Sequence, residues 1–159
     1  VHKDSNVKSL SDLEHRTFAF GSYHSYAGHF IIRKALSENG VKLSDLKLYS
    51  FLGRHERAVL SVAYGDFDAA ATTFGIAQRM KNLNYPVKTL YVTEELAPII
   101  IVAAPHMDSG LVKKLKNVLL EPTFEEEMEV SLFAPQGGFL AYNPGIYERV
   151  RQNIQSIEQ

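Results

Sequence analysis

The sequence predicts an α/β protein built around a mostly parallel β-sheet. Short runs of β-forming residues alternate with amphipathic helical segments over the first 92 residues, and the connections between them are short. Such an alternation is typical of parallel sheets, whose ligands bind at the carboxyl ends of the strands. At 159 residues the chain is long enough for one domain with a real core and too short for two ordinary ones.

The first strand and helix are expected to meet at a loop of small and polar residues. A capped helical turn at 9–13 leads to the β-forming run Thr17 to Phe20, which stops at Gly21. Helical spacing of apolar residues then begins at Tyr26 and ends at Asn39-Gly40. This stretch is therefore expected to place the amino end of a helix beside the end of a strand.

Further strands and helices follow in the same order, each recognised by its apolar pattern and its turn residues. They are a strand at 47–51, a helix at 55–64 that stops at Gly65, a strand at 69–71, a helix at 74–83, and a fourth strand at 87–92. Beyond these, the apolar run 97–105 has about half the length of a membrane span, so we expect a buried strand. Helices are expected at 109–120, 124–132 and 144–157, apparently without a sheet to cover.

Composition excludes several functional classes. A formal net charge of −1 gives no electrostatic argument for binding nucleic acid or an anionic membrane surface. The absence of cysteine rules out disulfide scaffolds, thiolate metal sites and cysteine nucleophiles. Because the sequence starts at Val1 without a start methionine, we expect a piece of a longer protein.

The loop from Gly21 to Gly28 is the first candidate site. The first four amides of a helix lack intrahelical acceptors and carry the positive end of the helix dipole, so they favour an anion. Ser22 and Ser25 offer hydroxyl groups, while Ala27 and Gly28 allow close approach. The alternative is a plain strand-to-helix connection that Ser25 caps.

Two further residues are candidates, each with a simpler alternative. His55 opens a helix after a strand, so it should lie at the same sheet edge as Ser25, unless it only caps the helix. Asp68 precedes a short strand and could hold a cation, cap a backbone group or form the turn, which is the favoured reading. His24 and His29 have the wrong spacing for a zinc site, and no serine nucleophile motif is present. We therefore expect no catalytic residue, metal or cofactor.

Together these segments resemble a known family. Leu10 to Leu13, Thr17 to Gly21, Ser25-Tyr26-Ala27-Gly28, His55 and Gly65 to Ala71 are similar, in order and spacing, to the phosphate, phosphite and phosphonate substrate-binding proteins of ABC transporters. These are type 2 periplasmic binding proteins. The similarity covers residues 1–102 and, more weakly, Gly138-Phe139 and Tyr147 to the end.

The resemblance implies where a ligand would bind. In that family a Ser-Thr-Ser-Gly turn at a helix amino end grips the phosphonate oxygens. Ser25 and Gly28 match the turn, whereas Tyr26 and Ala27 replace its central residues, which keeps the backbone donors and weakens the side-chain grip. His55 matches a histidine of the cleft. The implied ligand-binding residues are Ser22, Ser25, Tyr26, Ala27, Gly28, His55 and Asp68.

The resemblance also implies a division into lobes. Residues 1–92 would form lobe two, with the ligand-binding edge, and 93–104 would be the return hinge strand. Residues 105–159 would be the C-terminal helical part of lobe one. The implied location is periplasmic or extracytoplasmic, and the implied partners are a small phosphonate- or phosphate-like anion and either an ABC permease or a signalling output domain. Uncovered apolar faces on the C-terminal helices would also favour self-association.

Two other functional classes compete with a solute-binding module. One is a non-catalytic interaction or signalling domain whose pocket has diverged toward another solute, as the Tyr26-Ala27 departure suggests. The other is an enzyme that uses an edge containing His55 and Asp68, although no paired nucleophile and base is visible.

Overall fold

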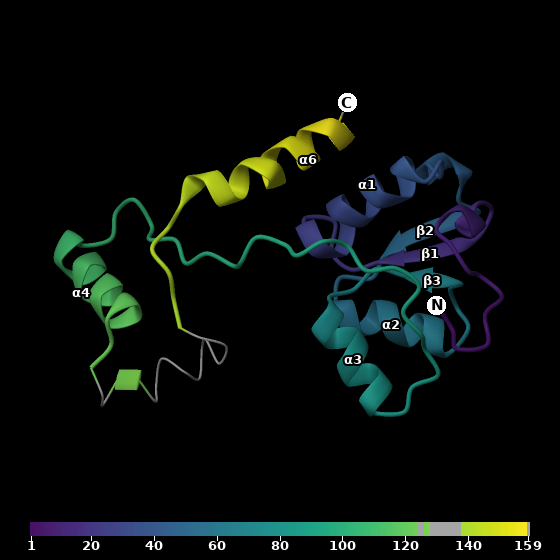
Figure 1. The fold of residues 1–159 in the computed structure, drawn as a ribbon, viewed down its shortest axis with the longest axis horizontal. Coiled ribbons are helices and arrows are strands. Elements are labelled where there is room, and N and C mark those ends of the chain that lie inside the picture. The colour runs from purple at the N-terminus through teal and green to yellow at the C-terminus, as the bar shows by residue number, and fades with distance from the viewer. Residues whose placement is uncertain (124–125, 128–137, 159) are drawn as a thin grey trace. The chain divides into compact units, whose positions relative to one another are not determined.

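The computed structural model describes residues 1–123, 126–127 and 138–158. The chain divides into two compact units, the first formed by Val1–Ala97 with Glu148–Gln159 and the second by Pro98–Tyr147. The sheet and the candidate site lie in the first unit (Figure 1). The division into lobes expected from the sequence stays a prediction.

The sheet contains three parallel strands in the order β2-β1-β3. Central β1 (Thr17–Phe20) pairs with β2 (Leu48–Phe51) on one side and with β3 (Ala69–Ala70) on the other. Because the strands are parallel, their carboxyl ends all lie at one edge, which we call the carboxyl edge. The predicted α/β class, the parallel pairing and these three strands are thereby confirmed.

Helices cover both faces of the sheet. Helix α1 (Ile31–Glu38) lies on one side, whereas α2 (His55–Ala63) and α3 (Phe74–Asn82) lie on the other (Figure 1). Strand β1 is accordingly buried on both faces, with Phe18, Ala19 and Phe20 at most 3% exposed. The predicted helix ends are also found: Gly40 and Gly65 follow α1 and α2 with φ of +82° and +85°.

Two predicted strands are absent from the structure. Val87 makes one isolated antiparallel bridge with His2, and within the described residues 88–92 join no ladder. The apolar run 97–105 is extended but exposed, with Ile99 at 98% and Val102 at 77%. An extended segment becomes a strand only beside a partner for its N–H and C=O groups, and the described part of the chain offers neither segment such a neighbour.

The second unit contains the predicted helix α4 (Ser109–Leu120). The Asp108 carboxylate caps it by accepting a hydrogen bond from the Leu111 amide at 2.8 Å. Most of the helix predicted at 124–132 lies outside the described residues. A 3₁₀ turn (Pro144–Tyr147) leads to the last helix, α6 (Glu148–Glu158), which packs with the first unit on α1. Among the helices described, none has the length and apolarity needed to cross a membrane.

Candidate functional site

The loop after β1 enters a helix that begins with a widened turn. Tyr26–Phe30 form a π-helical turn that continues directly into α1. The Ser25 hydroxyl accepts a hydrogen bond from the Gly28 amide at 3.0 Å, so Ser25 is the predicted cap. Since π-turns are frequent at functional sites and helix amino ends favour anions, the segment Ser25–Gly28 has the backbone chemistry of an anion-binding turn.

Backbone hydrogen bonds fix this loop to the carboxyl edge. The Gly21 amide donates to the Gly28 carbonyl at 3.2 Å, closing the loop on itself. The Gly53 amide, in the loop after β2, donates to the Gly21 carbonyl at 2.8 Å. This bond joins the loop after β1 to the loop after β2. Both candidate segments therefore lie together at the carboxyl edge.

His55 lies against both glycines. A methyl group placed on Gly28 would stand 2.8 Å from His55 Cε1, and one on Gly21 would stand 3.3 Å from His55 Nδ1. The structure therefore brings Ser25, Gly28 and His55 together, as the sequence predicts. His55 Nδ1 is buried and has no hydrogen-bond partner within the described chain. Such an unsatisfied nitrogen costs about 1–3 kcal/mol, a cost that a bound polar group could relieve.

His29 supports the loop through a contact with its backbone. The sequence did not predict it as a site residue. Its side chain is 1% exposed, and its Nδ1 lies 2.8 Å from the Tyr23 carbonyl, to which the neutral tautomer donates. Burial lowers the pKa of His29, against the opposing effect of that carbonyl and with a small contribution from Arg33. His29 is therefore a neutral anchor that fixes the loop, and its Nε2, like His55 Nδ1, is buried without a hydrogen-bond partner in the described chain.

The other predicted residues of the turn have different surroundings. Tyr26 accepts a hydrogen bond at its hydroxyl from Asn153 Nδ2 at 2.8 Å. Ser22 is half-buried, and its carbonyl accepts from the Ser25 amide at 3.0 Å. Ala27 lines a neighbouring pocket. Thus the turn is one structural unit, although its side chains point to different neighbours.

Asp68 lies at the opposite end of the sheet from the predicted anion site. Its carboxylate accepts hydrogen bonds from the Thr17 amide and hydroxyl, both at 2.8 Å, at the start of β1. Arg16 lies 3.7 Å from the same carboxylate. Because Ser25 and His55 are at the carboxyl edge, the structure does not bring Asp68 together with them. Of the roles that the sequence left open for Asp68, the structure shows the binding of a backbone group, the Thr17 amide, rather than the favoured turn.

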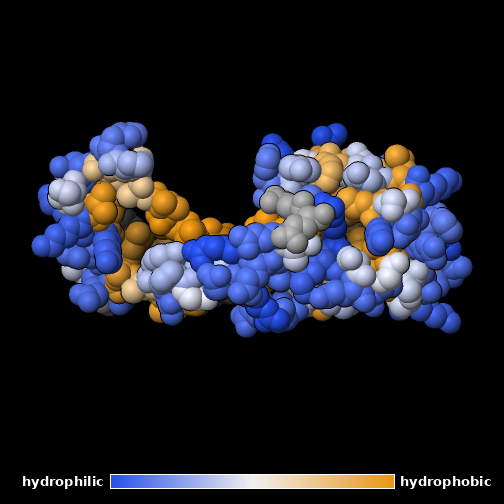
Figure 2. All heavy atoms as spheres, turned by 90° about the horizontal axis from the view of Figure 1, so that it is seen from above, coloured by the Kyte–Doolittle hydropathy of each residue, from blue (hydrophilic) through white to orange (hydrophobic). Residues whose placement is uncertain are grey.

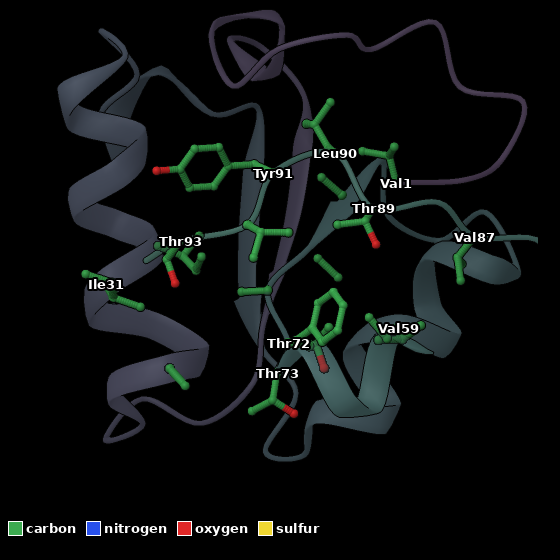
Figure 3. A pocket seen from close by; sticks show the side chains of 18 of the residues that line it. Val1, Ile31, Val59, Thr72, Thr73, Val87, Thr89, Leu90, Tyr91 and Thr93 are labelled. Carbon is green, nitrogen blue, oxygen red and sulfur yellow. The ribbon is translucent and has the colours of Figure 1, made fainter. Parts of the chain in front are cut away.

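A largely apolar pocket of about 470 Å³ adjoins the turn. It lies between α1, the end of β3 and the extended segment 87–96, so that Ile31 and Val59 face it from opposite helices (Figure 3). Thr72 also lines it, and the Thr72 hydroxyl is buried without a hydrogen-bond partner in the described part of the chain.

Thr72 is a candidate that the sequence analysis missed. It follows β3 at the carboxyl edge, as Ser25 and His55 follow β1 and β2. The available signal was its position after the triple alanine, because side chains that follow parallel strands meet at one edge.

The described residues contain no cluster of three or more acidic, histidine or cysteine side chains that could hold a metal ion. The groups at the carboxyl edge that can contact a ligand are backbone amides, hydroxyls and the imidazole of His55. These groups suit the binding of a small oxyanion.

Comparisons with known proteins identify the family and agree with the fold. Residues 1–142 match the family described as "ABC transporter, phosphonate, periplasmic substrate-binding protein". No curated protein matches the chain. A solved structure of PhnD1 from Prochlorococcus marinus (MIT 9301), in complex with methylphosphonate, is similar in fold, with a TM-score of 0.82 and 22% sequence identity. The match covers 99% of this chain and 62% of the PhnD1 chain, so this chain spans less than two thirds of that protein.

Proposed function

Because the chain belongs to the family of periplasmic phosphonate-binding proteins of ABC transporters, we propose that it binds a small phosphonate- or phosphate-like anion at the carboxyl edge of its sheet. The observation that carries this proposal is the convergence of Ser25, Gly28 and His55 there. The family consists of substrate-binding proteins and not of enzymes. The separation of Asp68 from His55 removes the edge on which the competing enzyme hypothesis relied.

Each group at this edge has a distinct role in the proposal. The amides at the start of the helix, apart from that of Gly28, which already donates to Ser25, supply donors and the positive end of the dipole, and Gly28 leaves room for the ring of His55. His55 and Thr72 each bring a polar atom that is buried without a partner in the described chain. A bound oxyanion with several acceptor oxygens is the kind of ligand that uses such donors together.

The proposal extends to the role of the whole protein. By family, the bound anion would be passed to an ABC permease outside the cytoplasm, and closure of a two-lobed cleft would favour the bound state. The solved relative was crystallised with methylphosphonate, which makes this compound the first ligand to try. The comparisons give no support to a signalling output domain.

The test is a titration of the 159-residue chain followed in ¹H–¹⁵N spectra, with methylphosphonate, phosphate, phosphite and 2-aminoethylphosphonate. We expect saturable shifts centred on the amides of Ala27 and Gly28. Ser25→Ala, His55→Ala and Thr72→Val should each weaken binding by about ten- to a hundredfold, because a hydrogen bond to a charged group contributes about 1.5–3 kcal/mol.

Matched controls are available on exposed positions. Ser44→Ala and His15→Asn remove the same side-chain types at exposed positions that precede β2 and β1, at the opposite end of the strands from the carboxyl edge, and they should leave the affinity unchanged. A folded chain whose Ala27 and Gly28 amides respond to none of the four anions would contradict the proposal. So would equal losses in the control variants.

A further inference from the structure

The C-terminal helix contacts the anion-binding turn through one buried polar pair. Asn153 of α6 donates from Nδ2 to the Tyr26 hydroxyl at 2.8 Å, although the two residues are 127 positions apart in the sequence. Asn153 is only 7% exposed, which is unusual for an asparagine on a helix. Helix α6 also contacts the π-helical turn and α1, so the pair lies within a packed interface.

Tyr26 occupies the second position of the segment whose amides form the proposed site. The Ser25 hydroxyl holds the segment from within, by accepting from the Gly28 amide. Asn153 contacts the segment from another helix, through the Tyr26 hydroxyl. If the phenol ring moved away, the buried Asn153 amide would lose its hydrogen-bond partner, and this cost opposes the movement. The segment Ser25–Gly28 is thereby held by two hydrogen bonds, one within the segment and one from a distant helix to the Tyr26 side chain.

A second polar link from the same helix serves as a comparison. Arg149 pairs with Glu94 at 2.6 Å, but both side chains are largely exposed, at 67% and 47%. Exposed ion pairs contribute little to stability and constrain their neighbours weakly. The Asn153–Tyr26 pair is therefore the polar contact of α6 that can act on the turn.

We propose that Asn153 is a positioning residue for the anion-binding turn, acting through the Tyr26 hydroxyl. Docking of the C-terminal helix then sets the orientation of the Ala27 and Gly28 amides, and anion binding depends on a residue that follows the second unit in the sequence. The expected effect of Asn153 on anion affinity rests on the proposed function. The expected effect of Asn153 on the conformation of the turn does not.

The test combines Asn153→Ala, Tyr26→Phe and the double variant in the 159-residue chain. The first readout needs no ligand: the Ala27 and Gly28 amide resonances should move in both single variants. Asn153→Gln, which keeps the donor, should restore part of the native shifts. Arg149→Ala, on the same helix, should leave them in place.

The second readout is the affinity for methylphosphonate. Each single variant should bind about three- to tenfold more weakly, and the double variant should bind no more weakly than the weaker single one, because both remove the same contact. Unchanged Ala27 and Gly28 resonances in Asn153→Ala, or losses of affinity that multiply, would overturn the inference. If the resonances move as expected but the native chain binds no anion, the proposed function fails while the positioning role stands.

Discussion

At the scale of single residues, the site depends on a close approach that only glycine permits. The ring of His55 and the hydroxyl of Ser25 would stand 2.8 Å and 3.1 Å from a methyl group on Gly28. Carbon atoms do not approach to 2.8 Å without a shift of their surroundings. The small residue at this position is therefore required by packing.

Gly28→Ala is accordingly expected to destabilise the chain and to weaken anion binding. Overpacking at a buried site costs about 1–3 kcal/mol, measured as the free energy of unfolding in urea. The matched control is Gly75→Ala in α3, where a methyl group meets nothing within 4 Å. There the same change should stabilise by about 0.5–1 kcal/mol, because alanine loses less backbone entropy in a helix. Equal effects of the two substitutions would contradict this packing argument.

The residues predicted correctly for the edge are those set by local order along the chain. Ser25 and His55 each follow a strand and open a helix, and parallel pairing of the strands then brings them to one edge. Thr72 follows the same rule but was missed. Asn153 could not be found in this way, since its partner is 127 residues away and no periodic pattern records which helix will contact Tyr26.

At the scale of elements, a carboxylate bracket joins the starts of β1 and β3. Asp68 accepts from the Thr17 amide and hydroxyl, and the Asp68 amide donates back to Thr17 Oγ1 at 2.9 Å. Burial alone would raise the pKa of Asp68, but the hydrogen bonds from Thr17 and the charges of Arg16 and Lys47 lower it overall. The bracket thus stabilises the sheet most when Asp68 is ionised.

Asp68→Asn should remove this stabilisation and its dependence on pH. A carboxyl group with a lowered pKa in the folded state stabilises above its ordinary value of 3.8, and the effect is lost as the pH falls through the folded-state pKa. At neutral pH we expect a loss of about 0.5–1 kcal/mol, modest because the side chain is partly exposed to solvent. Urea unfolding between pH 7 and 3 measures it, with Asp66→Asn, at an exposed neighbour, as the control. An unchanged slope of stability against pH in Asp68→Asn would refute the bracket.

The two strands predicted wrongly, at 87–92 and 97–105, failed for a reason that also belongs to this scale. Their β-forming and apolar residues have side chains that suit a sheet. A strand also needs a second strand beside it that can accept and donate backbone hydrogen bonds. Beyond the bridge from Val87 to His2, the described chain places no ladder beside either segment. The sequence pattern identifies a segment that suits a sheet. It does not show whether the fold places a free sheet edge beside that segment.

At the scale of the whole molecule, the apolar run 97–105 leaves hydrophobic side chains open to solvent. Ile99 is 98% exposed and Ile101 is 66% exposed, and hydrophobic residues remain in view on the surface (Figure 2). In helix α4, Leu111 and Leu115 are each 46% exposed. An extended apolar segment with unpaired backbone groups is a template for pairing with another chain.

We therefore expect the 159-residue chain to self-associate as its concentration rises, as measured by sedimentation velocity. Alternate residues of an extended segment share a face, so Ile99→Lys with Ile101→Lys places two charges on one side and should shift the distribution toward monomer. The control is Leu83→Lys, an isolated leucine that is 62% exposed after α3 and should leave the distribution unchanged. Because single exposed apolar residues are common on monomers, only the contiguous run should drive association. A native chain that stays monomeric up to high micromolar concentration would show that this run is covered within the molecule in solution.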